Sequence, residues 1–257
     1  MTQDLLRPYL NKPLAEGWNP FLENDPESQM DFGIVRINQG KSHTFQSETQ
    51  ESALLVLEGK GVIHFQGIET SFDRNSWIDQ LPWTVHAPCG ETITVTADAP
   101  TEIAVTYTPN PDSFEPHLYP PDEVEVEHRG EGILDNAAHR VVRTIFDRRN
   151  APEKARLVLG EVLNFPGRWS SYPPHHHPQP ELYYYRFSPE WGYGHGELGE
   201  TIVKLRHHDL LRIAGEQDHP QCAAPGIFMY YLWAIRHLPN DPYLGFEYTK
   251  PFEDLLR

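Results

Sequence analysis

The chain has 257 residues, of which 37 are acidic and 21 are lysine or arginine, for a formal net charge of −16 at pH 7. This length suits one large β domain or two barrels of ordinary size. So large an acidic excess argues against binding to nucleic acid or to an anionic membrane surface, since both require basic contacts. It allows a small anionic substrate, which needs only one or two local cations.

The sequence predicts neither a membrane segment nor a secretion signal. No run of about eighteen apolar residues occurs, and the first residues, MTQDLLRPYLNKPLAEGW, lack the basic front and apolar middle of a signal peptide. Two cysteines, Cys89 and Cys222, are too few for a disulfide framework in a chain this long. We therefore predict a reducing, cytoplasmic compartment.

Short apolar runs separated by turn residues predict an all-β fold. The 24 prolines and 18 glycines interrupt the chain often, and helical periodicity is scarce. After an irregular arm over residues 1 to about 30, the first half predicts strands at 32–37, 53–57, 62–65, 84–86, 92–96 and 102–107. Glu58-Gly59-Lys60-Gly61, between the second and third of these strands, predicts the turn of a β-hairpin.

A proline-rich, acidic connector from Pro109 to about Asp135 divides the chain. Strands are predicted again at 140–146 and 156–162, so the halves have the pattern of a diverged repeat. We predict an N-terminal domain over residues 1–135 and a C-terminal domain over residues 136–257.

The first half is predicted to bind no metal. Its histidines, His43, His64 and His86, are scattered and lack ligand spacing, although Glu51 and Glu58 are nearby in the sequence. We therefore expect two barrels, of which only the second carries a metal site.

The stretch WSSYPPHHHPQPELYYYRF in the second half concentrates side chains that bind metals. Strand residues two apart point to the same side, so His175 and His177 can converge while His176 faces away. The prolines that follow bar a regular ladder, and Glu181 then opens an aromatic return strand. Two imidazoles and one carboxylate on adjacent strands predict most of a metal site.

The fourth ligand must come from further along the chain, and His219, in Asp218-His219-Pro220, is the best candidate. A run of three histidines can also be an ordinary polar loop. The combination of two alternate histidines, a carboxylate and a later single histidine resembles the ligand order of a cupin. Cupins are small β-barrels that hold a metal with three histidines and one glutamate.

Longer stretches resemble one family. GEVLNFPGRWSSYPPHHH, ELYYYRF and DHPQCAAPGIFMYYLW closely resemble the 5-deoxy-glucuronate isomerase family of inositol catabolism, which is related to the 4-deoxy-L-threo-5-hexosulose-uronate ketol-isomerases. ESALLVLEGKG, VHAPCGETITVTAD and EIAVTYTP extend the resemblance over nearly the whole chain. It implies a bicupin with two jelly-roll barrels and a divalent metal in the C-terminal one. The implied ligands are His175, His177, Glu181 and His219.

The resemblance implies isomerisation of a deoxy-uronic acid from aldose to ketose, from 5-deoxy-D-glucuronate to 5-dehydro-2-deoxy-D-gluconate. A metal bound to both substrate oxygens would stabilise the negative charge of an enediolate. Zinc suffices because no redox step is required, and manganese or iron(II) also fits nitrogen and oxygen ligands.

The sequence departs from the family pattern at three places. Only Pro178-Gln179-Pro180 separates the second histidine ligand from Glu181, Arg168 replaces a frequent asparagine, and the segment 192–197 reads Gly-Tyr-Gly-His-Gly-Glu. The choice among uronates therefore stays open.

Further residues are candidates for substrate binding and proton transfer. Tyr183 and Tyr185 share the phase of Glu181 and are expected to line the pocket. Arg186 or Arg168 is expected to bind the substrate carboxylate, because guanidinium groups pair with carboxylates bidentately. The candidates for the proton carrier are Glu161, His195 and Tyr183.

Three classes of function stay open on the sequence. The first is the uronate isomerase, the second is another metal-cupin enzyme such as a dioxygenase, and the third is a non-catalytic protein that binds sugar acids. Edge strands of cupin barrels often pair between subunits, so a homo-oligomer is expected.

Overall fold

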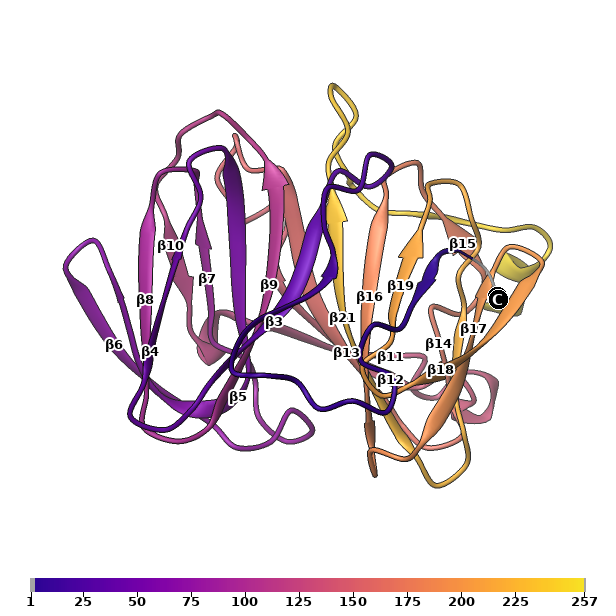
Figure 1. Cartoon of the computed structure of the whole chain (residues 1–257). Coiled ribbons are helices and arrows are strands. Elements are labelled where there is room, and N and C mark those ends of the chain that lie inside the picture. The colour runs from indigo at the N-terminus through magenta and orange to yellow at the C-terminus, as the bar shows by residue number, and fades with distance from the viewer. Residues whose placement is uncertain (1–2, 257) are drawn as a thin grey trace. The chain divides into compact units, whose positions relative to one another are not determined.

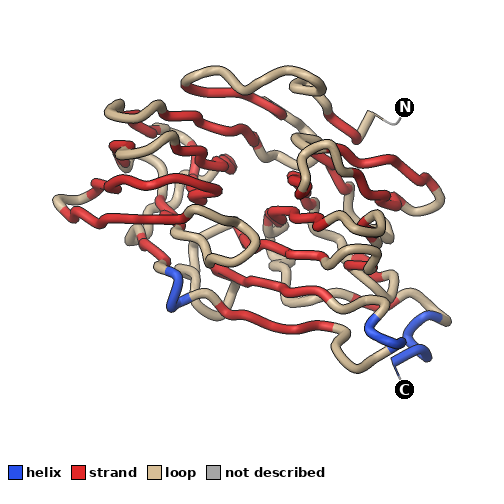
Figure 2. The backbone as a smooth tube through the Cα atoms, turned by 90° about the horizontal axis from the view of Figure 1, so that it is seen from below, coloured by secondary structure: helices blue, strands red, loops and turns tan. Residues whose placement is uncertain are grey.

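The computed structural model describes residues 3–256; residues 1, 2 and 257, which the predicted domains include, lie outside the described part. Strands and loops make up nearly all of the described chain (Figure 2). Within it, helix is confined to short 3₁₀ segments at Pro121–Glu123, Leu134–Asn136 and Phe252–Leu256. The predicted all-β fold is confirmed. No helix in the described range is long and apolar enough to cross a membrane.

The chain divides into two compact units. The N-terminal unit contains Lys12–Val124 and Ile145–Leu157, and the C-terminal unit contains the described parts of Met1–Asn11, Glu125–Thr144 and Val158–Arg257. The predicted domain division at residue 135 stays a prediction, because compactness does not define which segments fold independently.

The N-terminal unit is an antiparallel sheet in the order β10-β7-β5-β9-β3-β2, to which β4, β6 and β8 add through β5 and through each other. The bounds are β2 Gly17–Leu22, β3 Asp31–Ile37, β4 Ser42–Gln46, β5 Gln50–Phe65, β6 Ile68–Arg74, β7 Thr84–Ala87, β8 Thr92–Ala97, β9 Thr101–Pro109 and β10 His117–Tyr119. Apolar side chains from the main strand path and from the added strands pack together into one core, which includes Val35, Leu54, Phe72 and Val105.

The predicted hairpin within residues 53–65 is wrong, because β5 runs through the glycines as one strand. Its first part pairs with β7 and β9 and its last part pairs with β6 and β8, with a register shift between Val56 and Glu58. Gly59 has φ +135°, and a Cβ there would lie 2.7 Å from the Cα of Thr101. The glycine therefore bends a strand that crosses from one set of partners to the other, rather than reversing the chain.

The C-terminal unit contains most of a sheet in the order β1-β19-β16-β21-β13-β12-β11, a second sheet in the order β14-β20-β17-β18, and the pair β15-β22. Of the first sheet, residues 145, 146 and 157 belong to the N-terminal unit. In Figure 1, β16, β19 and β21 lie side by side. The bounds are β1 Leu5–Leu6, β11 Glu125–Arg129, β12 Arg140–Phe146, β13 Leu157–Asn164, β14 Trp169–Ser170, β15 His175–His176, β16 Glu181–Ser188, β17 Tyr193–Leu198, β18 Thr201–Arg206, β19 Leu210–Ile213, β20 Gln221–Ala223, β21 Phe228–Arg236 and β22 Glu247–Tyr248.

The predicted irregular arm over residues 1–30 is wrong in two places. Its first part forms β1, which pairs with β19 in the C-terminal unit, and a later part forms β2, which pairs with β3 in the N-terminal unit. Asp4 supports the first pairing, since its Oδ1 accepts a hydrogen bond from Arg212 Nη2 at 2.8 Å.

The central strand β16 separates two environments in the C-terminal unit. Tyr183, Tyr185 and Phe187 enter a buried core together with Tyr231 of β21. Because side chains alternate along a strand, Tyr184 and Arg186 point to the opposite face of the sheet. Glu181, the first residue of β16, has the phase of the core-facing tyrosines.

Candidate metal centre

The four predicted ligands are carried by segments at one end of the C-terminal unit. His175 lies in β15, His177 follows that strand, Glu181 begins β16, and His219 precedes β20. The prolines between His177 and Glu181 make a turn that lies on Gly215, where a Cβ would approach Pro178 O to 2.0 Å. The turn therefore reverses the chain tightly enough to bring His177 back over Glu181.

Three of these side chains form a group of potential ligand atoms that lie within 4.8 Å of one another: His177, Glu181 and His219. Glu181 Oε2 lies 3.3 Å from His177 Nε2 and 3.4 Å from His219 Nε2. All three side chains are buried. Ligand atoms around a tetrahedral zinc ion are about 3.3–3.5 Å apart, given metal–ligand distances near 2.1 Å. The spacing therefore fits a metal ion.

His175 lies next to this group without being part of it. Its ring centroid is 4.9 Å from that of His219, with the two planes at 77°. The side chain is buried at 8% exposure. The structure thus brings together three of the four predicted ligands and holds the fourth beside them.

Hydrogen bonds fix the tautomers of two histidines. His175 Nδ1 lies 3.1 Å from Pro173 O, and His219 Nδ1 lies 2.8 Å from Gln217 O. A carbonyl oxygen can only accept, so both Nδ1 atoms carry the proton and both Nε2 atoms keep a lone pair. This arrangement, in which the second ring nitrogen donates to the protein, is the usual one for metal-binding histidines.

The buried nitrogen His219 Nε2 lies 3.4 Å from Glu181 Oε2 and has no hydrogen-bond partner among the described residues. An unsatisfied buried polar atom costs about 1–3 kcal/mol. Such a cost is a common sign of a functional site, and for imidazole lone pairs beside a carboxylate a metal ion is the fitting partner.

Burial keeps the imidazoles of His175 and His219 uncharged. It lowers the pKa of His175 well below the ordinary value, and neighbouring His219 adds to the effect. Burial also lowers the pKa of His219, against the opposing pull of Glu181. Only a neutral imidazole binds a metal, so both side chains are in the binding form at neutral pH.

His176 points away from this group, as the alternation of side chains predicts. Its Nδ1 lies 3.1 Å from Thr249 Oγ1 and 3.2 Å from Asp218 Oδ1. Thr249 in turn donates from its backbone N–H to Pro174 O at 2.9 Å. His176 therefore connects the histidine segment to the C-terminal segment of the chain.

The C-terminal segment covers the histidines, which the sequence did not indicate. The ring of Phe246 stacks on His175 at 4.0 Å between centroids, and Tyr243 meets His177 edge-on at 4.9 Å. A pocket of about 510 Å³ adjoins His177 under this segment. Acidic side chains are among its lining residues: Glu216, Asp241 and Glu247.

The predicted pocket tyrosines are held by hydroxyl contacts. Tyr183 Oη lies 3.2 Å from Ser171 Oγ, and Ser171 Oγ lies 3.2 Å from Tyr231 Oη. Tyr185 donates to Gln221 Oε1 at 2.7 Å. The Ser-Ser pair that precedes the histidines thus orients the aromatic wall beside Glu181.

The two arginines predicted to bind a carboxylate lie elsewhere. Arg186 is on the face of β16 opposite Tyr185, and Arg168 donates to Asp135 O at 3.0 Å from a partly exposed position. A third arginine, Arg140, was not predicted from the sequence. It is buried, donates to Tyr172 O at 3.1 Å, and its charge acts on His175 and Tyr231.

The predicted proton carriers Glu161 and His195 are not beside the histidine group. Glu161 is fully buried and accepts a hydrogen bond from Tyr230 at 2.6 Å; Tyr230 alternates with the core residues Met229 and Tyr231. His195 is exposed on β17.

The unusual glycines of β17 have a packing role. A Cβ on Gly196 would lie 2.4 Å from Gln221 Oε1, and one on Gly194 would lie 2.7 Å from Cys222 O. Gln221 Nε2 donates to His219 O at 2.6 Å. Gly196 therefore leaves space for an amide that braces both Tyr185 and the backbone of His219, and Gly194 allows the close approach of the Cys222 backbone.

Comparisons with known proteins show the family and the fold of the chain. A family model described as the KduI/IolB family matches residues 9–254. A protein of Geobacillus thermodenitrificans named 5-deoxy-glucuronate isomerase is 30% identical over 241 residues, covering 82% of this chain and 83% of that protein.

Solved structures show the same fold. An IolB-like protein from Salmonella typhimurium LT2 superposes with a TM-score of 0.83 at 21% identity, covering 95% of this chain and 97% of that one. A cupin 2 conserved barrel domain protein from Leptotrichia buccalis gives a TM-score of 0.54 at 12% identity, over 92% of this chain and 98% of that one. The predicted cupin-type fold is confirmed.

Proposed function

Because the chain belongs to the KduI/IolB family, we propose that it is a metal-dependent isomerase that converts a deoxy-uronic acid from aldose to ketose. The substrate we propose is 5-deoxy-D-glucuronate, and the product is 5-dehydro-2-deoxy-D-gluconate. The relative from Geobacillus thermodenitrificans carries the name of this activity.

The observation that carries the proposal is the buried group of His177, Glu181 and His219, with His175 beside it. Two imidazoles and a carboxylate at this spacing suit a divalent ion, and His175 Nε2 is the fourth donor we propose. When bound, the ion would act as a Lewis acid toward the two substrate oxygens. Zinc is the ion we propose, and manganese or iron(II) fits the same donors.

Arg140 is the cation that we propose for the substrate carboxylate, in place of Arg186 and Arg168. Its guanidinium is buried, and burial lowers its pKa despite the opposing pull of Tyr231. A carboxylate at this point would gain a charge-assisted partner. The acidic pocket beside His177 repels an anion, so the carboxylate should lie toward Arg140.

Tyr183 is the group that we propose to hold a proton beside the reacting carbons. Burial raises the pKa of its hydroxyl well above the ordinary value, and the charge of Glu181 adds to this. The hydroxyl thus stays protonated at neutral pH and can donate a hydrogen bond to a developing oxyanion. Ser171 orients it.

Phe246 and Tyr243 are proposed to exclude water while the substrate is bound. Their rings contact His175 and His177 directly. Exclusion of water strengthens every electrostatic interaction in the site and protects a reactive enediolate. The cytoplasmic location and the homo-oligomer stay predictions.

The test is conversion of 5-deoxy-D-glucuronate followed by NMR, using the purified protein before chelation, after chelation, and after zinc or manganese is restored. We expect the 2-deoxy-5-keto acid to form only with metal. Conversion that survives chelation would overturn the metal dependence. Stoichiometric metal without conversion would overturn the substrate, and oxygen consumption would favour the dioxygenase interpretation.

A further inference from the structure

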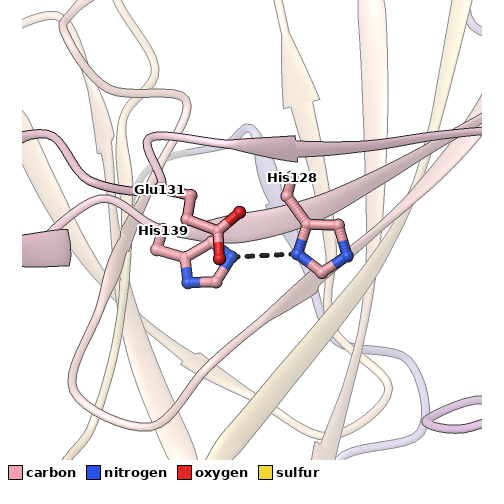
Figure 3. Close-up of side chains that lie close together, drawn as sticks. All are labelled: His128, Glu131 and His139. Carbon is pink, nitrogen blue, oxygen red and sulfur yellow. Dashed lines mark hydrogen bonds between the residues drawn. The ribbon is translucent and has the colours of Figure 1, made fainter.

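A second group of metal-type side chains lies outside the proposed active site, on the hairpin of β11 and β12. His128 comes from β11, His139 directly precedes β12, and Glu131 comes from the turn between them. One potential ligand atom from each of the three lies within 4.8 Å of the other two. In Figure 3 a nitrogen of each ring points toward the other ring, and the Glu131 carboxylate lies close to them.

The two imidazoles are spaced as ligands of one ion. His128 Nδ1 lies 3.1 Å from His139 Nε2, close to the roughly 3.3 Å that separates two nitrogens on a tetrahedral zinc ion. Glu131 is exposed, so its carboxylate can move by rotation about its own side-chain bonds to complete the set.

The positions of the imidazoles are fixed by the hairpin rather than by a loose loop. Arg129 pairs with Arg140 at the end of the ladder, next to both histidines. Gly130 has φ +74°, and a Cβ there would lie 2.5 Å from Ala138 O. The ring of His139 also packs on Phe165, with centroids 4.8 Å apart. A metal would therefore find two of its donors already in place.

A hydrogen bond between the imidazoles is the competing explanation for their approach. Such a bond needs one ring to donate and the other to accept, and it gives no role to Glu131. A carboxylate oxygen within 4.8 Å of a nitrogen of each ring is an arrangement that a cation explains and a single hydrogen bond does not. Imidazole with carboxylate is a donor set that suits zinc and related ions.

We propose that His128, Glu131 and His139 bind a second divalent ion of the zinc class, with water in the open coordination position. The site is independent of the function proposed above. Two of its ligands are exposed and the third is half-buried, so its ion should exchange faster and bind more weakly than one held by the buried group.

This ion would stabilise a loop that is connected to the active-site segment. Trp169 N donates to Ala137 O at 2.7 Å, and Arg168 donates to Asp135 O at 3.0 Å. Cross-linking the two ends of the 130–139 turn should therefore slow hydrogen exchange in residues 130–139, with a smaller effect at 168–170.

The experiment counts metal ions on the full chain by native mass spectrometry and equilibrium dialysis with zinc. We expect two ions per wild-type chain, and one ion per chain in His139→Ala. Glu131→Gln should weaken the second binding event at least about tenfold, and its exposed position makes a folding defect an implausible cause. His177→Ala should lose the tighter ion and keep the weaker one.

His117→Ala is the matched control. His117 Nε2 lies 2.8 Å from Glu123 Oε2, and both side chains are exposed. Unlike the hairpin group, this pair is not among the groups of three ligand-type side chains in the described residues. The control should still bind two ions. One ion per wild-type chain that His139→Ala retains, or a second ion unaffected by both His139→Ala and Glu131→Gln, would overturn the site. A second ion lost in His139→Ala but unchanged in Glu131→Gln would overturn the role of the carboxylate.

Discussion

Both units bury a glutamate against a histidine, yet the two carboxylates differ in how fully protein donors occupy them. In the N-terminal unit, Glu51 Oε1 lies 2.7 Å from His86 Nε2, with both side chains at 0% exposure. The same carboxylate accepts from Asn110 Nδ2 at 2.7 Å and from the backbone N–H groups of Arg156 and Leu157 at 2.9 and 3.0 Å.

These donors leave Glu51 no capacity for a metal. Burial alone would raise its pKa, but the hydrogen bond and charge of His86, followed by Asn110 and the Arg156 backbone, hold the pKa below the ordinary value. The ring of His86 is also stacked on Phe146, with centroids 4.1 Å apart. The Glu51–His86 pair therefore stabilises the packing of segments of the N-terminal unit against each other.

Glu181 in the C-terminal unit lacks such saturation. Within residues 3–256 the one hydrogen-bond partner of its carboxylate is His177, and His219 Nε2 lies 3.4 Å away without forming a hydrogen bond. Both pairs consist of a glutamate and a histidine. They differ because the carboxylate of Glu181, unlike that of Glu51, keeps lone pairs that no protein donor occupies. A buried carboxylate beside histidine indicates a metal site only where backbone donors have not filled it.

The largest effect expected from this comparison is the loss of metal in Glu181→Gln. We expect tight metal binding and turnover to fall by at least about a hundredfold, since even residues behind metal ligands contribute about 10–100-fold. The matched change Glu51→Gln should keep the metal and instead destabilise the fold by about 3–5 kcal/mol, because it breaks a buried pair. Metal analysis and urea unfolding measure both. Loss of metal in Glu51→Gln would contradict the comparison.

The two units also differ in what their buried arginines contact. Arg74 in the N-terminal unit donates to Val56 O and Gln80 O, and it is fully buried there. Arg140 in the C-terminal unit instead lies where its charge reaches His175 and Tyr231. We expect Arg140→Met to lower kcat/KM by about 10–100-fold, the worth of one charged hydrogen bond, with metal content unchanged.

Arg140→Lys should recover part of this loss because it keeps the charge. Arg168→Met serves as the control, and its kcat/KM should stay within about threefold of wild type. A larger loss in Arg168→Met or in Arg186→Met than in Arg140→Met would return the carboxylate contact to the residues that the sequence predicted.

Acid should act on the C-terminal unit through the half-buried His208. Burial, followed by the charge of Arg186, lowers the pKa of His208 from 6.5 to about 3. Between these values the unfolded chain binds a proton that the folded chain does not, so stability falls as the pH falls below 6.5. One such group contributes a slope of at most about 1.4 kcal/mol per pH unit.

His208→Asn should make that slope shallower. Asparagine tolerates the φ of +63° at this position and can accept from Tyr184, whose hydroxyl lies 2.6 Å from His208 Nδ1. Urea midpoints at pH 7, 6 and 5 measure the effect. An unchanged pH dependence in the variant would show that His208 does not carry this proton linkage.

The smallest effect expected is that of Gly196→Ala. The added Cβ would push the Gln221 amide away from Tyr185 and from the backbone of His219, at a cost of about 1–2 kcal/mol. Metal affinity should fall with it, because the amide braces His219. Differential scanning calorimetry with and without metal measures both effects; equal shifts in the two forms would refute the link to His219.

The sequence predicted features that depend on neighbours along the chain. The alternation of side chains along β16 correctly predicted that Tyr183 and Tyr185 share one face. The same alternation predicted that His176 points away from His175 and His177. The same local signals failed at β5, where the two glycines predict a hairpin turn but Gly59 bends one long strand instead. Glycine allows both outcomes, and only the pairing partners decide between them.

Features that depend on distant segments were not predictable from one sequence. The pairing of Glu51 with His86 needs strands β5 and β7 to be adjacent, and the placement of Arg140 depends on how β12 meets the Ser-Ser segment. The cover of Phe246 over His175 joins residues about seventy positions apart. No spacing rule in the local sequence encodes these contacts.

The short strand β1 has a consequence for handling the protein. Leu5 and Leu6 pair with Leu211 and Leu210, so this segment covers the outer edge of β19. An uncovered strand edge is a template for pairing with other chains. A fragment that begins at residue 136, or a chain shortened by its first dozen residues, would expose that edge and should aggregate, whereas extensions added before Leu5 leave the edge protected.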